Sequence, residues 1–333
     1  MIGHRGAPGY RPEHTRSSYE LALRSGVDAV EPDVVPTRDG VLVIRHENEI
    51  STTTDVADHP RFADRRTTKT IDGVARTGWF TEDFTWDELS SLRSRERLPR
   101  LRPDSAAFDD SEPMLRLRDL LDLVAGWPER SGRRPGVVLE IKHAAYFEAH
   151  GYDLAALVAD ELRGAGWGAE EHPLWFESFE PTVLARLRAL GVPGEYVFLL
   201  EADGAPADLV AVDGASARTY AAWAAPDGLD ELARTVDGVS LDKQMILAPD
   251  SRGRTAGSAP VVADAHARGL AVFTWTCRPE NAFLIRQFRT PGGKASFGDY
   301  RAEWDVIAAS GVDGVFVDHA DLGMDFFGRS AQR

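Results

Sequence analysis

The sequence has little of three things, and each shortage excludes a class of protein. Its single cysteine, Cys277, cannot form an internal disulfide, so a disulfide-stapled fold is excluded and the thiol is expected to be inert packing. No apolar run is long enough to span a bilayer, which argues against stable membrane insertion. Basic residues are outnumbered, and the net charge of −15 argues against nucleic acid or an anionic membrane as a partner.

The hydrophobic content of the chain is sufficient for one large core. The chain has 333 residues, of which 43% are hydrophobic, and this excludes a disordered chain. A single α/β barrel with insertions often has this length, so we expect one domain over residues 1–333. No signal peptide precedes the first motif. The segment before it is so short that we expect a trimmed start or a lost leader, which leaves the compartment open.

Eight short apolar segments are typical of β-strands, and most are separated by helical patterns. Parallel strands buried on both faces form continuous apolar runs, and eight βα units predict a closed (β/α)8 TIM barrel of the α/β class. The predicted strands are 2–3, 29–33, 136–142, 174–179, 196–200, 238–241, 270–275 and 314–317. Helices are predicted over 117–124, 154–162 and 181–190.

A long polar stretch, about residues 47–113, interrupts this alternation after the second predicted strand. Loops of this length are uncommon within a compact domain, so we predict an inserted subdomain over the barrel mouth. Within it, Thr85 is followed by Glu88 three residues later. This spacing predicts a capped helix start, because the two side chains can each satisfy a free backbone N–H group.

The first forty-six residues carry most of the candidate chemistry. Glu31 and Asp33 lie two apart on a predicted strand, so both carboxylates face the same side. Two unpaired acids side by side repel one another, and a divalent cation with oxygen ligands would relieve that repulsion. The Asp39-Gly40 turn signal then predicts a hairpin whose second strand runs into His46.

The same spacing returns on the third predicted strand. Glu140 and Lys142 add a carboxylate and an ammonium group to the inner face. In a parallel barrel the site lies at the C-terminal ends of the strands, and His4, Arg5 and Trp275 also fall at or near such ends. These residues are therefore expected to converge.

Four motifs in this order resemble the N-terminal signature of the glycerophosphodiester phosphodiesterases. They are His4-Arg5-Gly6, Pro12-Glu13-His14-Thr15, Glu31-Pro32-Asp33 and the segment 37–46 that ends in His46. The sequence departs from the family at His14, where Asn is usual, and at Glu47, where Asp usually follows the histidine. The size of the insertion resembles the longer bacterial type, which is often exported.

The resemblance implies a metal-dependent enzyme that splits glycerophosphodiesters into sn-glycerol 3-phosphate and an alcohol. It implies Ca²⁺ or Mg²⁺ held by Glu31, Asp33 and Glu140, which would polarise the phosphoryl oxygen. It also implies that His4 and His46 act as general base and general acid.

The resemblance assigns further roles around the substrate. Arg5 and Lys142 would contact the phosphate oxygens, and Glu13 would orient an active-site partner. Phe179 and Trp275 would line the glycerol pocket.

Several of these assignments have a rival. Glu31 and Asp33 could form ion pairs with barrel arginines, although Glu140 beside them favours a metal. Lys142 could simply neutralise Glu140, and Phe179 and Trp275 could be ordinary barrel packing. Lys243 is expected to be a solvated loop lysine. Surface or satisfied core positions are expected for the histidines at 59, 143, 150, 172, 266 and 319.

Two other functions stay open at this point. A related, phospholipase D-like barrel could act on a lysophospholipid, a sphingolipid or a teichoic acid. A lipid substrate predicts an apolar patch at the mouth, and the charged segment from Asp55 to Arg76 argues against one. A non-catalytic barrel that only binds a phosphorylated ligand would not need two titrating histidines. The expected partner is thus a small glycerophosphodiester, with a homodimer left open.

Overall fold

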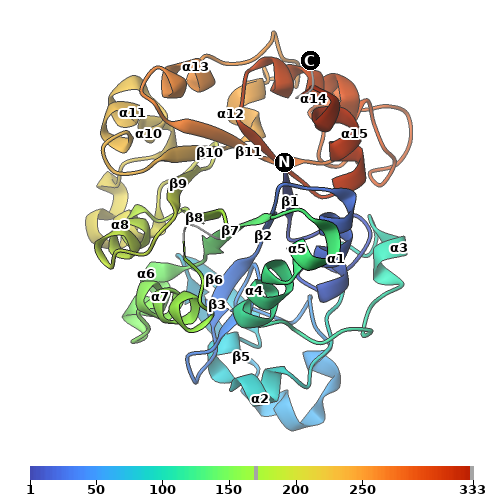
Figure 1. Ribbon diagram of the computed structural model, residues 1–333, viewed down its shortest axis with the longest axis vertical. Helices are drawn as coiled ribbons and strands as arrows, with labels where there is room; N and C mark the ends of the chain where they lie inside the picture. The colour runs from blue at the N-terminus through green and yellow to red at the C-terminus, as the bar shows by residue number, and fades with distance from the viewer. Residues whose placement is uncertain (169–171, 331–333) are drawn as a thin grey trace.

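A closed parallel β-barrel organises the protein. The computed structural model describes residues 1–168 and 172–330. The barrel strands are β1 (Ile2–His4), β2 (Ala29–Glu31) continuing as β3 (Asp33–Pro36), β7 (Gly136–Ile141), β8 (Leu174–Ser178), β9 (Glu195–Leu200), β10 (Gly238–Asp242), β11 (Ala271–Cys277) and β12 (Gly314–Val317). Every neighbouring pair in this ring is parallel, and the β2–β7 pairing closes it. The (β/α)8 barrel expected from the strand pattern is confirmed (Figure 1).

The second barrel strand is broken at Pro32, which has no N–H group to donate to a neighbouring strand. Its first half, β2, pairs with both β1 and β7, and its second half, β3, pairs with β7 and with the antiparallel strand β4 (Leu42–Ile44). The β3–β4 turn closes where the Thr37 N–H donates to the Val41 carbonyl at 2.9 Å. The predicted hairpin is confirmed, and it returns the chain to the barrel just before His46.

Helices fill most of the connections between barrel strands and surround the barrel (Figure 1). The first helix begins where the Thr15 side chain accepts from the Ser18 N–H, and it ends at Gly26 with φ +97°. The helices predicted over 117–124, 154–162 and 181–190 are confirmed. The full set is α1 (Arg16–Ser25), α4 (Leu117–Ala125), α5 (Trp127–Ser131), α6 (Ala144–Ala149), α7 (Leu154–Gly164), α8 (Pro181–Ala189), α9 (Ala207–Asp213), α10 (Tyr220–Trp223), α11 (Pro226–Leu232), α12 (Lys243–Leu247), α13 (Val261–His266), α14 (Tyr300–Ala309) and α15 (Ala320–Ser330).

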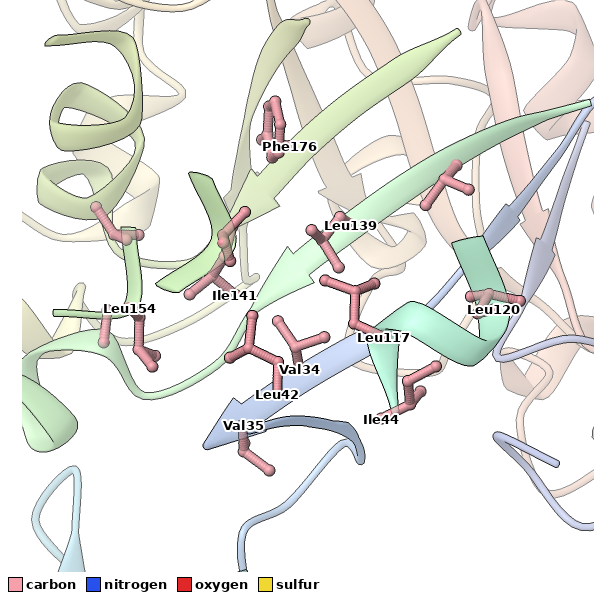
Figure 2. Close-up of a cluster of buried hydrophobic side chains, with 14 of the residues drawn as sticks. Val34, Val35, Leu42, Ile44, Leu117, Leu120, Leu139, Ile141, Leu154 and Phe176 are labelled. Atoms are coloured by element: carbon pink, nitrogen blue, oxygen red, sulfur yellow. The ribbon is translucent and has the colours of Figure 1, made fainter. Parts of the chain in front are cut away.

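The main core lies between the outer face of the barrel and these helices. Val34 and Leu139 point outward from β3 and β7 toward Leu117 on α4 (Figure 2). All three are fully buried, and each side chain of this size contributes about 1.5–3 kcal/mol by leaving water. This packing fixes which residues of each strand face outward, and therefore which face the barrel interior.

The barrel interior begins as a small apolar layer and becomes polar toward the strand ends. Ile2, Ala29, Val138 and Phe316 form the apolar layer. Because side chains alternate along a strand, the residues two positions further along face the same interior. In β1, β2 and β7 those residues are acidic or imidazole side chains.

Residues 47–113 hold short elements outside the barrel sheet. These are a two-stranded hairpin, β5 (Thr67–Ile71) and β6 (Val74–Gly78), with the helices α2 (Trp86–Leu89) and α3 (Pro103–Ala106) and the 3₁₀ turns 56–58, 60–65 and 81–83. The capping box predicted at Thr85 and Glu88 is confirmed. An inserted subdomain over the mouth stays a prediction. Within the two described ranges, no helix is both long and apolar enough to cross a membrane.

Candidate active site

Three buried carboxylates meet where the barrel interior becomes polar. Glu31, Glu140 and Glu177 come from β2, β7 and β8, and each offers an oxygen within 4.8 Å of the others. Burial, reinforced by the negative charges of Asp33 and Glu177, raises the pKa of Glu31 well above its usual range. Burial also raises the pKa of Glu140 to about 8. When ionised, the three groups repel one another, and a cation between them would relieve that repulsion.

Glu177 is absent from the residues singled out in the sequence, although a signal for it existed. It lies two positions before Phe179 on the predicted fourth strand. In the barrel, Glu177 is in register with Glu140 on the neighbouring strand. The spacing of two that identified Glu31 and Glu140 applies equally to this strand.

Asp33 lies beside this group but has other partners. Its Oδ2 atom is 2.9 Å from Nε2 of His14 and 3.4 Å from Nε of Arg5, while its Oδ1 is 3.8 Å from Nζ of Lys142. Burial alone would raise the pKa of Asp33, but the neighbouring His46 ring and the positive charges of Arg5 and Lys142 hold it well below its usual range. Asp33 is therefore ionised and bridges the carboxylates to the basic residues.

His14, which stands where the related family has Asn, holds Asp33 in place. Its backbone has φ +62°, a left-handed conformation that His, Asn and Asp tolerate better than most residues. Its ring spans Tyr19 Oη, 2.7 Å from Nδ1, and Asp33 on the other side. Glu13 is held independently by Arg97 and by Nη1 of Arg5 at 3.1 Å. The exchange of Asn for His thus leaves Glu13 anchored.

His4 is oriented by an aspartate from the last barrel strand's end. Its Nδ1 lies 2.6 Å from Oδ1 of Asp318, and since a carboxylate can only accept, Nδ1 carries the hydrogen. Oδ2 of Asp318 accepts from Arg102 and Arg278 at 2.5 and 2.6 Å. Burial and the charge of Arg5 lower the pKa of His4 to about 4 despite its acidic partner. His4 is therefore neutral, with its lone pair on Nε2.

His46 is held in the same tautomer by different residues. Its Nδ1 lies 2.9 Å from Oε1 of Glu47, so Glu47 serves as an acceptor in the place where Asp is usual. Its Nε2 lies 3.3 Å from Nζ of Lys142, which also donates to Oε1 of Glu140 at 2.7 Å. Burial, with the charges of Arg5 and Lys142, lowers the pKa of His46 well below its usual range.

Most of the predicted site residues share one cavity. It has a volume of about 690 Å³, a size typical of small-molecule sites, and its lining includes His4, Arg5, His46, Glu140, Glu177, Phe179 and Trp275. The Phe179 and Trp275 rings meet edge to face at 5.6 Å. A second cavity of about 800 Å³ shares His46 and Glu140 and adds Lys142. Glu13, Glu31 and Asp33 are buried behind these walls.

The acidic group fits a divalent cation. Oε1 of Glu31, Oδ1 of Asp33 and Oε2 of Glu177 are buried without a hydrogen-bond partner among the described residues. When all four are ionised, these three carboxylates and Glu140 outnumber the two neighbouring cations, Arg5 and Lys142, by two charges. An all-oxygen donor set with two excess negative charges suits Ca²⁺ or Mg²⁺.

The expectation for Lys243 is wrong. Lys243 begins α12 and is buried, with its Nζ 2.5 Å from Oε1 of Glu303 on α14. A buried carboxylate more than fifty residues away in the sequence gives the ammonium group a partner that local sequence could not indicate. Cys277 is fully buried, as expected.

Comparisons with known proteins agree over nearly the whole chain. A family model described as the glycerophosphoryl diester phosphodiesterase family matches residues 4–322. A glycerophosphodiester phosphodiesterase of Arabidopsis thaliana is 29% identical over 95% of this chain and 82% of its own length. One from Haemophilus influenzae is 25% identical over 98% and 89%.

Solved structures share the fold. A phosphodiesterase from Oleispira antarctica, in complex with the product sn-glycerol-3-phosphate, has a TM-score of 0.63 at 19% identity, covering 98% of this chain and 96% of that one. A glycerophosphodiester phosphodiesterase from Agrobacterium tumefaciens has a TM-score of 0.57 at 18% identity, covering 96% of both chains.

Proposed function

Because this chain belongs to the glycerophosphoryl diester phosphodiesterase family, we propose that it hydrolyses glycerophosphodiesters to sn-glycerol 3-phosphate and an alcohol. Membership confirms the resemblance carried by the four N-terminal motifs, and with it the expectation of an enzyme. The product bound to the Oleispira antarctica phosphodiesterase supports a substrate of this kind.

We propose that His4 is the general base. Asp318 holds its Nδ1–H, so Nε2 is the nitrogen that can accept a proton. A neutral imidazole is required for this step, and the lowered pKa of His4 supplies it at neutral pH. The proton would come from the attacking oxygen, and the hydrogen bond to Asp318 would stabilise the imidazolium that forms.

His46 is proposed as the general acid, on the opposite side of the reacting phosphate. Its pKa is held low by burial, Arg5 and Lys142, and it would rise when the anionic substrate covers these charges. His46 could then carry the proton that the leaving alkoxide takes. Glu47 would stabilise the charged ring through Nδ1.

The phosphate is proposed to lie between Arg5 and Lys142. Arg5 is fixed by Glu13 and by its backbone N–H, which donates to Oε2 of Glu31 at 2.8 Å. A fixed guanidinium can bind two phosphate oxygens at once, whereas Lys142 supplies a single point charge. Lys142 also neutralises Glu140, as the rival interpretation expected, so the two roles are combined in one residue.

Glu31, Asp33 and Glu140 are proposed to hold a divalent cation, with Glu177 as an adjoining fourth carboxylate. Such an ion, when bound, would polarise the phosphoryl oxygen. The single observation that carries the proposed function is the convergence of two neutral, oriented histidines with this acidic group in one cavity.

The experiment is release of glycerol 3-phosphate from glycerophosphocholine, with EDTA, Ca²⁺ or Mg²⁺. We expect turnover that EDTA abolishes and that either ion restores. His46→Ala should lower kcat by at least about 10²-fold. The matched control is His266→Ala, because His266 pairs with Asp313 on the surface and does not line the cavity. Turnover that survives both EDTA and His46→Ala would contradict the proposal.

A further inference from the structure

The cavity that contains His4 and His46 is also lined by two loops. One loop spans residues 249–253 after α12, and the other spans residues 282–289 after β11. The two loops are joined, because the Gln287 N–H donates to the Gly253 carbonyl at 2.9 Å and the Gln287 side chain accepts from the Thr255 N–H at 2.9 Å. They form one continuous wall.

This wall is anchored from behind by the buried pair Lys243 and Glu303. Oε1 of Glu303 binds Lys243, and its Oε2 accepts from the Ile285 N–H at 2.8 Å. A hydrogen bond within the second loop also stabilises its turn, because Nε of Arg289 donates to the Leu284 carbonyl at 2.8 Å. The backbone that presents Arg286 and Arg289 is thus fixed by a buried ionic contact.

Three arginines on the wall lack an acidic partner. Arg252, Arg286 and Arg289 line the cavity, and no carboxylate of the described chain lies within 4.0 Å of their guanidinium groups. Arg278, at the inner end of the same cavity, is by contrast bound to Asp318. Other exposed arginines of the described residues, such as Arg100 and Arg234, also have no carboxylate within this distance, but Arg252, Arg286 and Arg289 share one cavity.

The acids at this end do not neutralise the three arginines. Asp250 pairs with Arg254, with Nη2 3.2 Å from Oδ2. Asp242 accepts from the Gln244 N–H at 2.8 Å and so caps α12. The cavity therefore runs from the proposed phosphate-binding centre to a wall with three arginines that form no ion pair with a described carboxylate.

We propose that this wall binds a second anionic group, carried by the alcohol part of the diester. The inference rests on the proposed function and narrows its substrate class to glycerophosphodiesters whose alcohol bears a further phosphate. The scissile phosphate lies with Arg5 and the carboxylates, so the arginines on the wall are available to a group further along the same molecule. Guanidinium groups suit a phosphate monoester, which offers several oxygens to bidentate donors.

The test compares glycerophosphoinositol with glycerophosphoinositol 4-phosphate, which differ by one phosphate. We expect wild-type kcat/KM to be about tenfold higher for the phosphorylated substrate, a typical gain for one or two charge-assisted hydrogen bonds. The double variant Arg286→Gln/Arg289→Gln should remove most of this ratio. The matched control Arg163→Gln, an exposed arginine on α7, should keep it.

The outcomes separate the arginine subsite from the proposed hydrolase activity. Turnover of both substrates with a ratio near one, or a ratio that the double variant leaves intact, overturns the arginine subsite and spares the hydrolase. Absence of turnover on both substrates and on glycerophosphocholine overturns the proposed function, and the subsite with it.

Discussion

Nδ1 of His4 lies 2.6 Å from Oδ1 of Asp318, although the two residues are 314 positions apart in the chain. They meet because β1 and β12 are neighbouring parallel strands, so the first and last strands of the barrel end side by side. Arg102, from the segment between β4 and α4, binds the other oxygen of Asp318. Three distant parts of the sequence therefore determine how one imidazole is held.

Asp318→Asn should lower kcat by about 10²–10³-fold with a small change in KM. An amide can turn its NH₂ group toward Nδ1, which would move the hydrogen of His4 to Nε2 and remove the free lone pair. Steady-state kinetics on glycerophosphocholine checks this. Asp321→Asn is the matched control, because Asp321 is exposed and accepts a hydrogen bond from the Tyr10 hydroxyl at the surface. Equal losses in the two variants would contradict the role given to Asp318.

Arg102→Gln should destabilise the fold by about 3–5 kcal/mol. Arg102 is buried and pairs with both Asp318 and Glu280, so its loss leaves two buried carboxylates short of a partner. Chemical denaturation measures the effect. Arg100→Gln, which changes an exposed arginine two residues earlier, should alter stability by less than about 0.5 kcal/mol.

Glu177→Gln should have opposite effects with and without metal. In EDTA at pH 7.5, removing one of the mutually repelling buried acids should raise Tm by about 2–4 °C. Saturating Ca²⁺ should raise the Tm of Glu177→Gln by less than it raises the Tm of wild type. A ligand stabilises the folded state that binds it, and the variant has one carboxylate fewer to bind the ion. Thermal scans in both buffers test this. Glu195→Gln, which changes an exposed acid at the start of β9, should move neither value. A Glu177→Gln protein that is less stable in EDTA would contradict the carboxylate repulsion.

Stability of the metal-free protein should fall between pH 6.5 and 8. Burial raises the pKa of Glu140 to about 8, so the folded state keeps a proton that the unfolded chain has already lost. A group whose pKa is raised in the folded state stabilises the fold less and less as the pH rises toward that pKa. The free energy of unfolding falls by about 1.4 kcal/mol per pH unit for each proton that the folded state still holds and the unfolded chain has lost. His4, with a lowered pKa of about 4, acts in the opposite direction but only below its unfolded value of 6.5.

Urea denaturation in EDTA at several pH values checks the slope. Glu140→Gln should flatten it, and Ca²⁺ should reduce it, because a bound cation favours the ionised carboxylates. Stability that rises with pH across this window would show that the carboxylates are ionised in the metal-free fold.

Local spacing in the sequence was enough to predict the barrel and the placement of several site residues. Continuous apolar runs predicted all eight barrel strands, and alternation along β2 and β7 placed Glu31 and Glu140 on the inner face. Alternation alone could not predict that Asp33 pairs with basic residues beside the group formed by Glu31, Glu140 and Glu177. Its place is set by the break at Pro32 and by His14, which binds it from a left-handed turn.

The contacts that orient the histidines were not predictable in the same way. Asp318 contacts His4 across 314 positions, and Arg102, 98 positions from His4, binds Asp318, so no local pattern marks either residue. Lys243 illustrates the same limit, because Glu303 turns an apparently solvated lysine into a buried anchor. Long-range ionic partners of this kind become visible only when the barrel closes.

The most direct test of the account compares two leaving groups in the His4→Ala and His46→Ala variants. A p-nitrophenyl ester of glycerol phosphate releases a stable anion and needs no general acid, whereas the choline diester does. We predict that His46→Ala loses at least about 10²-fold in kcat on glycerophosphocholine but less than about tenfold on the nitrophenyl ester. His4→Ala should be impaired on both. Rescue of His4→Ala by the nitrophenyl ester, with His46→Ala impaired on both, would contradict the assignment of base and acid.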